Sequence, residues 1–421
     1  MGKASNSSRI GAIEAIQKKL LGKKLSYKEI YMLIDEIAHK RLSDVLTTYF
    51  VASSFKEGFS NDELYYLTKA MVETGNKLQF SGIVADKHST GGVSGTRTTM
   101  IIVPIIAAAG FTIPKTSSRA ITSPAGTADV MEVLAKVIFS TKQIKDIVTK
   151  VGGCIVWGGH LGIAPADDVI INVEEQLSFE PFDKIIVSIM AKKVAVSTTH
   201  LVLDIPVGPT MKIRHFNDAE KIAHKFKLIA DKFKIKIVTD INESLEPAGN
   251  GVGPAFEARD VLYVLEQKKE RPLGLEAKAL RLAGKLLNLC YQQSKTKKNG
   301  EEEACRLLYK GQALRKFREI VKAQGGDDQV SVDSLKIKSQ RSEVKSAKYG
   351  KIKRINNYNL NMIAKMLGAP REKFAGIYLQ KKIDDKVDKK EPLMSFYSSD
   401  VYKIKEAEVT LDNFPIYEIE S

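Results

Sequence analysis

The sequence predicts an α/β protein built from a small helical domain, a larger α/β domain with a central mixed sheet, and a C-terminal α+β domain. Apolar residues recur at helical spacing from Ser7 to Lys77, and short apolar strands alternate with helices after residue 83. A polar stretch at residues 324–347 then precedes the last segment. A chain of 421 residues is long enough for two or three such domains.

The helical domain is expected to span residues 1–78. The segments IEAIQKKLLG, EIYMLIDEIA and VLTTYFVASSF place apolar residues three and four positions apart, as amphipathic helices do. Ser60 and Glu63 form a capping-box pair that begins another helix. Residues 183–193 (DKIIVSIMAKK) are also predicted to be helical, so we expect residues 165–196 to join this domain.

The α/β domain is expected to comprise residues 79–164 and 197–325. Residues 83–87 are predicted to form a strand, which is followed by a glycine-rich loop (KHSTGGVSG), a buried helix (TTMIIVPIIAAAG) and a second strand (FTIPKTSS). Apolar runs at Cys154 and His200 predict further strands. Residues 326–421 are expected to form the C-terminal domain around one helix, NLNMIAKMLG.

The composition excludes several classes of protein. The N-terminal residues MGKASNSSRI lack the apolar core of a signal peptide, and the longest apolar run, Met100–Ala109, is too short to span a membrane. We therefore expect a cytoplasmic protein with no membrane partner. Because the three cysteines occur without CxxC or histidine pairing, neither a disulfide framework nor a zinc site is indicated.

The net charge of +15 allows more than one interpretation. Most of the excess is lysine spread along helices and the C-terminal third, which favours a solvated surface. Attraction of phosphate or phosphorylated substrates is the second interpretation. Basic stretches such as KYGKIKRINNYN leave a nucleic-acid-binding protein as a rival hypothesis, although we expect no nucleic-acid partner.

The segment DKHSTGGV, which begins at Asp86, places cationic and hydroxyl donors in a glycine-rich turn between a strand and a helix. Such turns bind oxyanions through backbone N–H groups, while Lys87 supplies a point charge and Ser89 and Thr90 supply hydrogen bonds. The segment is neither a GxxxxGK[ST] loop nor a GxGxxG fingerprint. Taken alone, a structural turn is as good an interpretation as a phosphate site.

A second donor-rich segment, Ser117–Thr127, is dense in hydroxyls around Arg119. An ordinary turn that leads into a helix capped by Thr127 is the alternative interpretation. Two such loops at the ends of neighbouring strands indicate a ligand site, because ligands of open α/β sheets bind outside the carboxyl ends of strands.

Four motifs together resemble the thymidine/pyrimidine-nucleoside phosphorylase family: DKHSTGGV, SSRAITSPAGTAD, LGIAPADD and SIMAKK, in that order and over nearly the whole chain. The segments KTSSRAITSPAGTADVMEVLA, GGCIVWGG and DIPVGPTMKIR are most similar to its archaeal AMP phosphorylase branch, the type 2 subfamily. The resemblance implies a nucleoside phosphorylase/phosphoribosyltransferase-like fold with the three domains described above, usually assembled as a homodimer or a higher homo-oligomer.

The resemblance also implies roles for individual residues. Phosphate contacts are implied at Lys87, Ser89, Ser117, Thr127 and either Thr98 or Thr99. His88 matches a histidine beside the sugar and base, and Ser188 and Lys192 match positions that contact the base. The AMP phosphorylase branch implies nucleotide contacts at Gly92, Ser118, Arg119, Ala120, Ile121, Thr122, Ser123, Thr127, Ser188 and Lys212. Glu180 stands where that branch has an aspartate as proton donor, so Glu180 and His88 are the candidate catalytic residues.

The activity implied is phosphorolysis of nucleoside 5′-monophosphates, in which AMP and phosphate give adenine and ribose 1,5-bisphosphate, with CMP and UMP as further substrates. Inorganic phosphate is the co-substrate, and neither a cofactor nor a metal is expected. A pyrimidine-nucleoside phosphorylase that yields a base and a pentose 1-phosphate is the main alternative. A phosphoribosyltransferase of the anthranilate type is another.

Three departures from the family pattern bear on these expectations. Pyrimidine enzymes have an arginine after the APAD motif, and Ile171–Glu175 contains none, which weakens the pyrimidine-nucleoside alternative. A glutamate at position 180 replaces the family aspartate. The branch usually carries a further N-terminal domain, whereas this sequence begins at the helical one, so we expect a simple oligomer such as a dimer.

Overall fold

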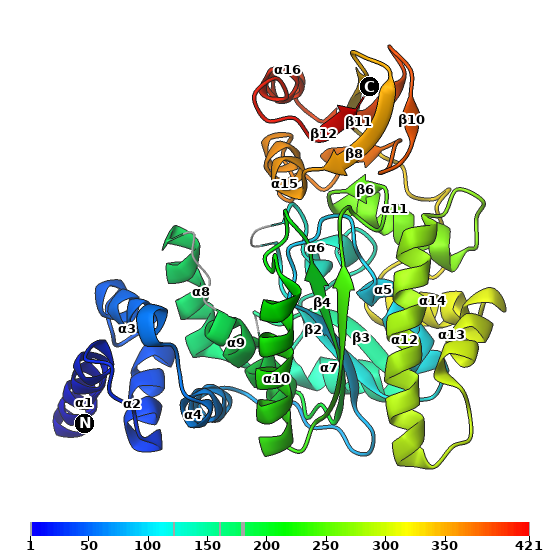
Figure 1. Ribbon diagram of the computed structural model, residues 1–421. Coiled ribbons are helices and arrows are strands. Elements are labelled where there is room, and N and C mark those ends of the chain that lie inside the picture. The colour runs from blue at the N-terminus through cyan, green and yellow to red at the C-terminus, as the bar shows by residue number, and fades with distance from the viewer. Residues whose placement is uncertain (1, 121–122, 160, 178–181, 421) are drawn as a thin grey trace. The chain divides into compact units, whose positions relative to one another are not determined.

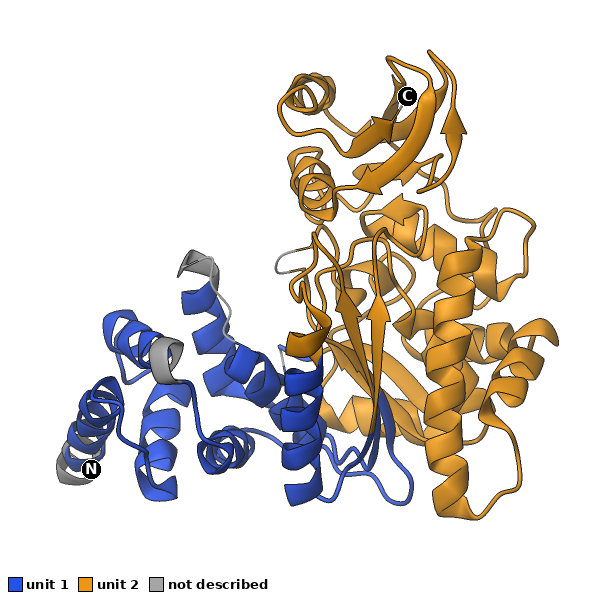
Figure 2. Cartoon of the chain, in the orientation of Figure 1, with its two compact units in different colours: residues 1–86, 158–201, 220–237 blue, residues 87–157, 202–219, 238–421 orange. Residues whose placement is uncertain are grey.

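The computed structural model describes residues 2–120, 123–159, 161–177 and 182–420 (Figure 1). The chain divides into two compact units (Figure 2). The first comprises residues 1–86, 158–201 and 220–237, and the second comprises residues 87–157, 202–219 and 238–421.

The first unit is mainly helical. Its helices are α1 (Gly2–Leu20), α2 (Tyr27–Ala38), α3 (Asp44–Glu57), α4 (Asn61–Glu73), α8 (Pro165–Leu177), α9 (Phe182–Ala195) and most of α10 (Phe216–Lys232). The predicted capping box begins α4, because the Glu63 carboxylate accepts a hydrogen bond from Ser60 N–H at 2.9 Å and Glu63 N–H donates back to the Ser60 hydroxyl. The pairs α2 and α4, α2 and α8, and α4 and α9 pack together. The fold thus contains the small helical domain that the predicted fold class includes.

The α/β part contains two sheets among the described residues. In one sheet β4 (His200–Val207) lies between β1 (Ala85–Ser89) and β5 (Lys236–Glu243), and in the other β2 (Ile113–Ser117) runs parallel to β3 (Gly153–Trp157). The helices of this part are α5 (Thr99–Ala108), α6 (Thr127–Met131), α7 (Thr141–Val151), α11 (Pro254–Leu265), α12 (Leu273–Ser294), α13 (Gly300–Tyr309) and α14 (Gln312–Ala323). Helix α5 is the predicted apolar helix, and its residues from Met100 to Ile106 are fully buried.

Strand β1 ends two residues later than the sequence predicts. His88 and Ser89, which were expected in the loop alone, belong to the strand. The N–H of Thr90 donates to the carbonyl oxygen of Asp204 on β4 at 3.0 Å, so backbone pairing continues to the end of these residues. Pairing with a central strand thus outweighs the low strand propensity of polar residues.

The C-terminal residues form an α+β fold, as the sequence predicts. Its elements are β7 (Gln340–Lys345), β8 (Gly350–Ile355), α15 (Asn357–Met366), β9 (Gly376–Leu379), β10 (Lys386–Val387), β11 (Pro392–Ser398), α16 (Val401–Thr410) and β12 (Tyr417–Glu420). One sheet has the order β10-β8-β12 and the other β6-β9-β11-β7, in which β6 (Gly251–Val252) comes from the preceding α/β part. Buried Ile352, Leu360, Ile377 and Phe396 form part of the core.

Candidate active site

Lys87 and Ser89 lie on one face of β1, because alternate residues of a strand point to opposite sides. The Nζ atom of Lys87 lies 3.8 Å from Oδ2 of Asp204, and the Ser89 hydroxyl hydrogen-bonds to the same residue. On the other face Asp86 forms a fully buried ion pair with Lys193 of α9. Buried carboxylates therefore anchor both faces of the strand that carries the first motif.

Asp204 is the centre of a polar network that the sequence analysis missed. Nζ of Lys278 lies 3.2 Å from its Oδ1, and the Asn242 amide donates to the same oxygen at 2.8 Å. Burial alone raises the pKa of Asp204, but Lys87, Lys278 and these hydrogen bonds outweigh burial and hold the pKa below its usual range. The carboxylate therefore stays ionised. The signal in the sequence was a lone acid within the apolar run HLVLDIPV, since buried acids are rare unless paired.

Four hydroxyls near the predicted phosphate loops are buried and have no hydrogen-bond partner among the described residues. They are Oγ1 of Thr90, Oγ1 of Thr98, Oγ1 of Thr116 and Oγ of Ser117. Thr98 is the residue before α5 and is 0% exposed, whereas Thr99 is the first residue of that helix. Native proteins pair nearly all buried hydroxyls, and the exceptions include sites for bound ions.

The glycine-rich loop lies against Lys212. Gly91 and Gly92 have φ values of +85° and +90°, a left-handed conformation that strongly favours glycine. A Cβ atom at Gly92 would lie only 2.9 Å from Cγ of Lys212. The structure thus brings together two residues, Gly92 and Lys212, for which the resemblance implies nucleotide contacts.

Arg119 of the second loop is held by ion pairs. Its guanidinium contacts Asp129 at 3.0 Å and Glu132 at 2.7 Å, and it lies over the Trp157 ring with Cζ 5.0 Å from the ring centre. The hydrogen bond to Glu132, followed by the one to Asp129, raises the pKa of Arg119 further. These contacts favour a role in holding the loop.

Asp129 also hydrogen-bonds to two backbone groups of this loop. Its Oδ2 atom accepts hydrogen bonds from the N–H groups of Ala120 at 2.7 Å and Gly126 at 2.9 Å. Ser118 is exposed, and the Ser123 hydroxyl donates to the carbonyl oxygen of Ala125 at 2.9 Å. Ile121 and Thr122 lie outside the described residues.

Arg97 links the two donor-rich loops and was also missed. Its Nη1 atom donates to Oγ1 of Thr127 at 3.2 Å, its Nη2 atom donates to the carbonyl oxygen of Ala125 at 3.0 Å, and its Nε atom pairs with buried Glu257. One guanidinium thus fixes the position of a predicted phosphate-binding hydroxyl. The sequence offered no signal for this role, because Arg97 lies outside all four motifs.

The residues predicted to contact the base lie on α9 in the first unit. Ser188 and Lys192 share a face of the helix, because they are four residues apart. The Ser188 hydroxyl donates to Oδ2 of Asp167 at 2.8 Å, and Nζ of Lys192 lies 2.8 Å from the same oxygen. The neighbouring Asp168 has a pKa raised to about 6, because the effect of burial exceeds the opposing effect of the Lys192 charge. Asp167 belongs to the LGIAPADD motif, so two of the four motifs meet here.

The structure describes one of the two candidate catalytic residues, His88, and not the other, Glu180. His88 lies on β1, half-buried, directly after Lys87. Glu180 lies outside the described residues. Within those residues, no group of three or more histidine, cysteine or acidic side chains is placed to hold a metal ion. None of the described helices is long and apolar enough to cross a membrane.

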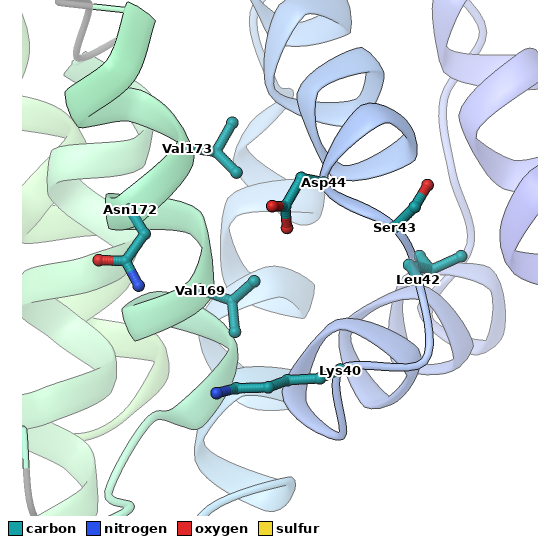
Figure 3. Close-up of a pocket in the computed structure, with 7 residues that line it drawn as sticks. All are labelled: Lys40, Leu42, Ser43, Asp44, Val169, Asn172 and Val173. Atoms are coloured by element: carbon teal, nitrogen blue, oxygen red, sulfur yellow. The ribbon is translucent and has the colours of Figure 1, made fainter.

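An open cavity of about 880 Å³ lies in the first unit, and its lining includes none of the predicted site residues (Figure 3). Its lining comes from the turn that joins α2 to α3 and from α8, and comprises Lys40, Leu42, Ser43, Asp44, Val169, Asn172 and Val173. Asn172 and Val173 belong to the stretch where pyrimidine enzymes have an arginine.

Known proteins resemble this chain in each of its parts. The model of the glycosyl transferase family, a/b domain, matches residues 81–314, and that of the helical bundle domain of the same family matches residues 13–75. The pyrimidine nucleoside phosphorylase C-terminal domain matches residues 351–416. The crystal structure of anthranilate phosphoribosyltransferase from Thermus thermophilus aligns with a TM-score of 0.62 at 16% identity, over 74% of this chain and 99% of that one. This last likeness shows the fold alone.

Relatives decide the family. "AMP phosphorylase 1" of Archaeoglobus fulgidus is 41% identical over 94% of this chain and 78% of its own length. "AMP phosphorylase" of Thermofilum pendens is 43% identical over 96% of this chain and 77% of its own length. The chain belongs to the thymidine/pyrimidine-nucleoside phosphorylase family. This phosphorylase family member is therefore an enzyme of the pentosyltransferase class. A "Putative thymidine phosphorylase" of Bradyrhizobium diazoefficiens is 43% identical over 92% of the chain and 75% of its own length.

Proposed function

We propose that this phosphorylase family member cleaves nucleoside 5′-monophosphates with inorganic phosphate, converting AMP to adenine and ribose 1,5-bisphosphate and also accepting CMP and UMP. The observation that carries the proposal is a group of buried hydroxyls, Thr98 and Ser117 among them, that have no hydrogen-bond partner among the described residues and stand in sequence beside the two donor-rich loops. Hydroxyl donors and a lysine suit a phosphate ion. Two relatives named AMP phosphorylase support the choice of nucleotide.

In this reaction an oxygen of phosphate forms a bond to C1′ of the sugar while the bond from C1′ to the base nitrogen breaks. The bonding electrons leave with the base, which then takes up a proton. Lys87, Ser89 and Thr127 hold phosphate in line with the breaking bond, and this positioning supplies much of the rate enhancement. No metal or cofactor takes part in the proposed steps.

The departing base is stabilised by hydrogen bonding and protonation. Ser188 and Lys192 bind the base, His88 lies beside the sugar, and Glu180 donates the proton to a purine nitrogen. To donate at neutral pH, Glu180 needs a pKa raised by burial. Glu180→Gln tests this role. The variant should lose most of the activity, together with the part of the pH dependence of the rate that comes from protonation of Glu180. An unchanged rate would exclude Glu180 from the reaction.

Lys212 is proposed to bind the 5′-phosphate of the nucleotide. It contacts Gly92, and its ammonium group is the charged member of the pair. The Ser118–Ser123 loop is proposed to supply hydrogen-bond donors to the nucleotide. Lys212→Ala should therefore raise KM for AMP while leaving KM for phosphate nearly unchanged.

Substrate identity is tested by incubating the protein with AMP, CMP, UMP, adenosine, uridine and thymidine, each with and without phosphate, and measuring the free base. Phosphate-dependent release from the monophosphates is expected. Release from uridine or thymidine alone would contradict the proposal and favour a nucleoside phosphorylase, the function named for the Bradyrhizobium relative. Release of base that does not depend on phosphate would contradict both the nucleotide and the nucleoside phosphorylase functions.

A further inference from the structure

Asn357 is a buried asparagine at the start of α15. The preceding residue, Asn356, caps the helix, because its side-chain oxygen accepts hydrogen bonds from the N–H groups of Tyr358 and Asn359. The Asn357 side chain is therefore not needed as a cap. It is only 1% exposed, so its amide must find partners inside the protein.

Both ends of the Asn357 amide bind the glycine-rich loop. Nδ2 donates to the carbonyl oxygen of Gly92, and Oδ1 accepts a hydrogen bond from the N–H of Ser94 at 3.1 Å. One turn later on α15, the side-chain oxygen of Asn361 accepts a hydrogen bond from the Ser94 hydroxyl. Residues four apart share one face of a helix, so two asparagines of that face fix the loop.

The same residue reaches the loop that carries Lys212. The backbone N–H of Asn357 donates to Oγ1 of Thr210 at 3.4 Å, two residues before Lys212. Gly92 in turn packs against the Lys212 side chain. Helix α15 therefore contacts both the glycine-rich loop and the loop that carries Lys212.

Strand pairing and hydrogen bonds attach the C-terminal domain to the α/β part that carries these loops. Its strand β9 pairs with β6, with Gly251 opposite Tyr378. Nζ of Lys382 donates to the carbonyl oxygen of Gly249 at 2.7 Å, and the N–H of Gly249 donates to the carbonyl oxygen of Gly95 at 2.8 Å. In Figure 1, α15 lies on the side of the α/β part toward which β4 points.

We propose that Asn357 is a positioning residue for nucleotide binding, and that the C-terminal domain completes the active site by holding the glycine-rich loop against Lys212. This inference rests on the proposed function, because it takes Gly92 and Lys212 as nucleotide contacts. Asn357 acts through the loop and does not touch the substrate.

The test compares Asn357→Ala with Asn359→Ala. Asn359 is a matched control, because it is 8% exposed on the same helix and donates to the carbonyl oxygen of Pro415, without a contact to the loop. Asn357→Ala should raise KM for AMP about tenfold, since two buried hydrogen bonds to the loop are lost, with little change in kcat. Asn359→Ala should lower Tm to a similar degree and leave KM for AMP unchanged. A similar rise in KM in both variants would overturn the proposal.

Hydrogen exchange tests the positioning role of Asn357 independently of which substrate the enzyme uses. In Asn357→Ala the Ser94 amide loses its acceptor, so peptides that cover residues 90–98 should exchange faster than in the wild type and in Asn359→Ala. Unchanged exchange in these peptides would overturn the positioning role. Faster exchange in a protein whose wild type releases no base from AMP would overturn the proposed function instead.

Discussion

The Nζ atom of Lys87 lies 3.8 Å from Oδ2 of Asp204, and the two residues are 3% and 2% exposed. A buried ion pair of this kind is stable only where further groups satisfy the charges. Lys278 of α12 and Asn242 of β5 do so. The arrangement holds the Lys87 ammonium in place, so the proposed binding of phosphate would cost less side-chain entropy.

Lys87→Ala should raise KM for phosphate about 30-fold, because it removes a charge-assisted hydrogen bond to the anion. KM for AMP should change much less. Initial rates measured over a range of phosphate concentrations at saturating AMP test this prediction.

Lys278→Ala is the control for that experiment, because Lys278 pairs with the same carboxylate. It should lower Tm but change KM for phosphate only slightly. If both variants raise KM for phosphate equally, Lys87 acts through the Asp204 network and not by direct contact.

Two nearly isosteric substitutions distinguish whether Thr98 or Thr99 contacts phosphate. Thr98 has a fully buried hydroxyl without a partner among the described residues, so Thr98→Val should leave Tm unchanged or raise it while KM for phosphate rises about fivefold. Thr99→Val should leave KM for phosphate close to that of the wild type. The reverse result would assign the phosphate contact to Thr99.

Arg97→Lys tests whether the geometry of the guanidinium matters. A lysine can still pair with Glu257 but cannot also reach both Thr127 and the Ala125 carbonyl group, because its ammonium is a single point charge. We expect the free energy of unfolding to fall by about 1 kcal/mol and KM for phosphate to rise several-fold. Urea unfolding and steady-state kinetics measure the two effects. A loss of stability without any change in KM would restrict Arg97 to a structural role.

His200 predicts how stability depends on pH. Burial, with repulsion from Lys236, lowers its pKa from 6.5 to about 4. As pH falls through 6.5 the unfolded chain takes up a proton that the folded imidazole does not, so the free energy of unfolding falls until the pH reaches the folded pKa. The loss between pH 7 and pH 4.5 is about 2 kcal/mol from this residue.

His200→Gln removes this contribution, since glutamine does not titrate. Urea unfolding at the two pH values should therefore show a smaller difference for the variant than for the wild type. An equal difference would assign the acid sensitivity to other groups.

The helices and the order of the domains could be predicted because they depend on local patterns. Residues close together in the sequence determine both the capping box at Ser60 and the apolar helix after Thr98. The strand at Lys87 was predicted to end two residues too early, because His88 and Ser89 are polar and only pairing with β4 makes them extended.

The missed site residues act across long separations in sequence. Arg97 pairs with Glu257, Asp204 with Lys87, and Asn357 with Gly92. Periodicity and local motifs carry no information about such partners, which exist only once the chain has folded. The roles implied for individual residues stay predictions until the variants are measured.

Strand β6 gives the C-terminal fold a consequence for protein engineering. Because Gly251 and Val252 supply an outer strand of its four-stranded sheet, no cut in the chain separates the two parts without exposing unpaired backbone groups on both. The last hundred or so residues are therefore not a detachable module that can be exchanged between enzymes at a linker. A working chimera needs its junction upstream of β6, so that the strand and the sheet it completes are inherited together.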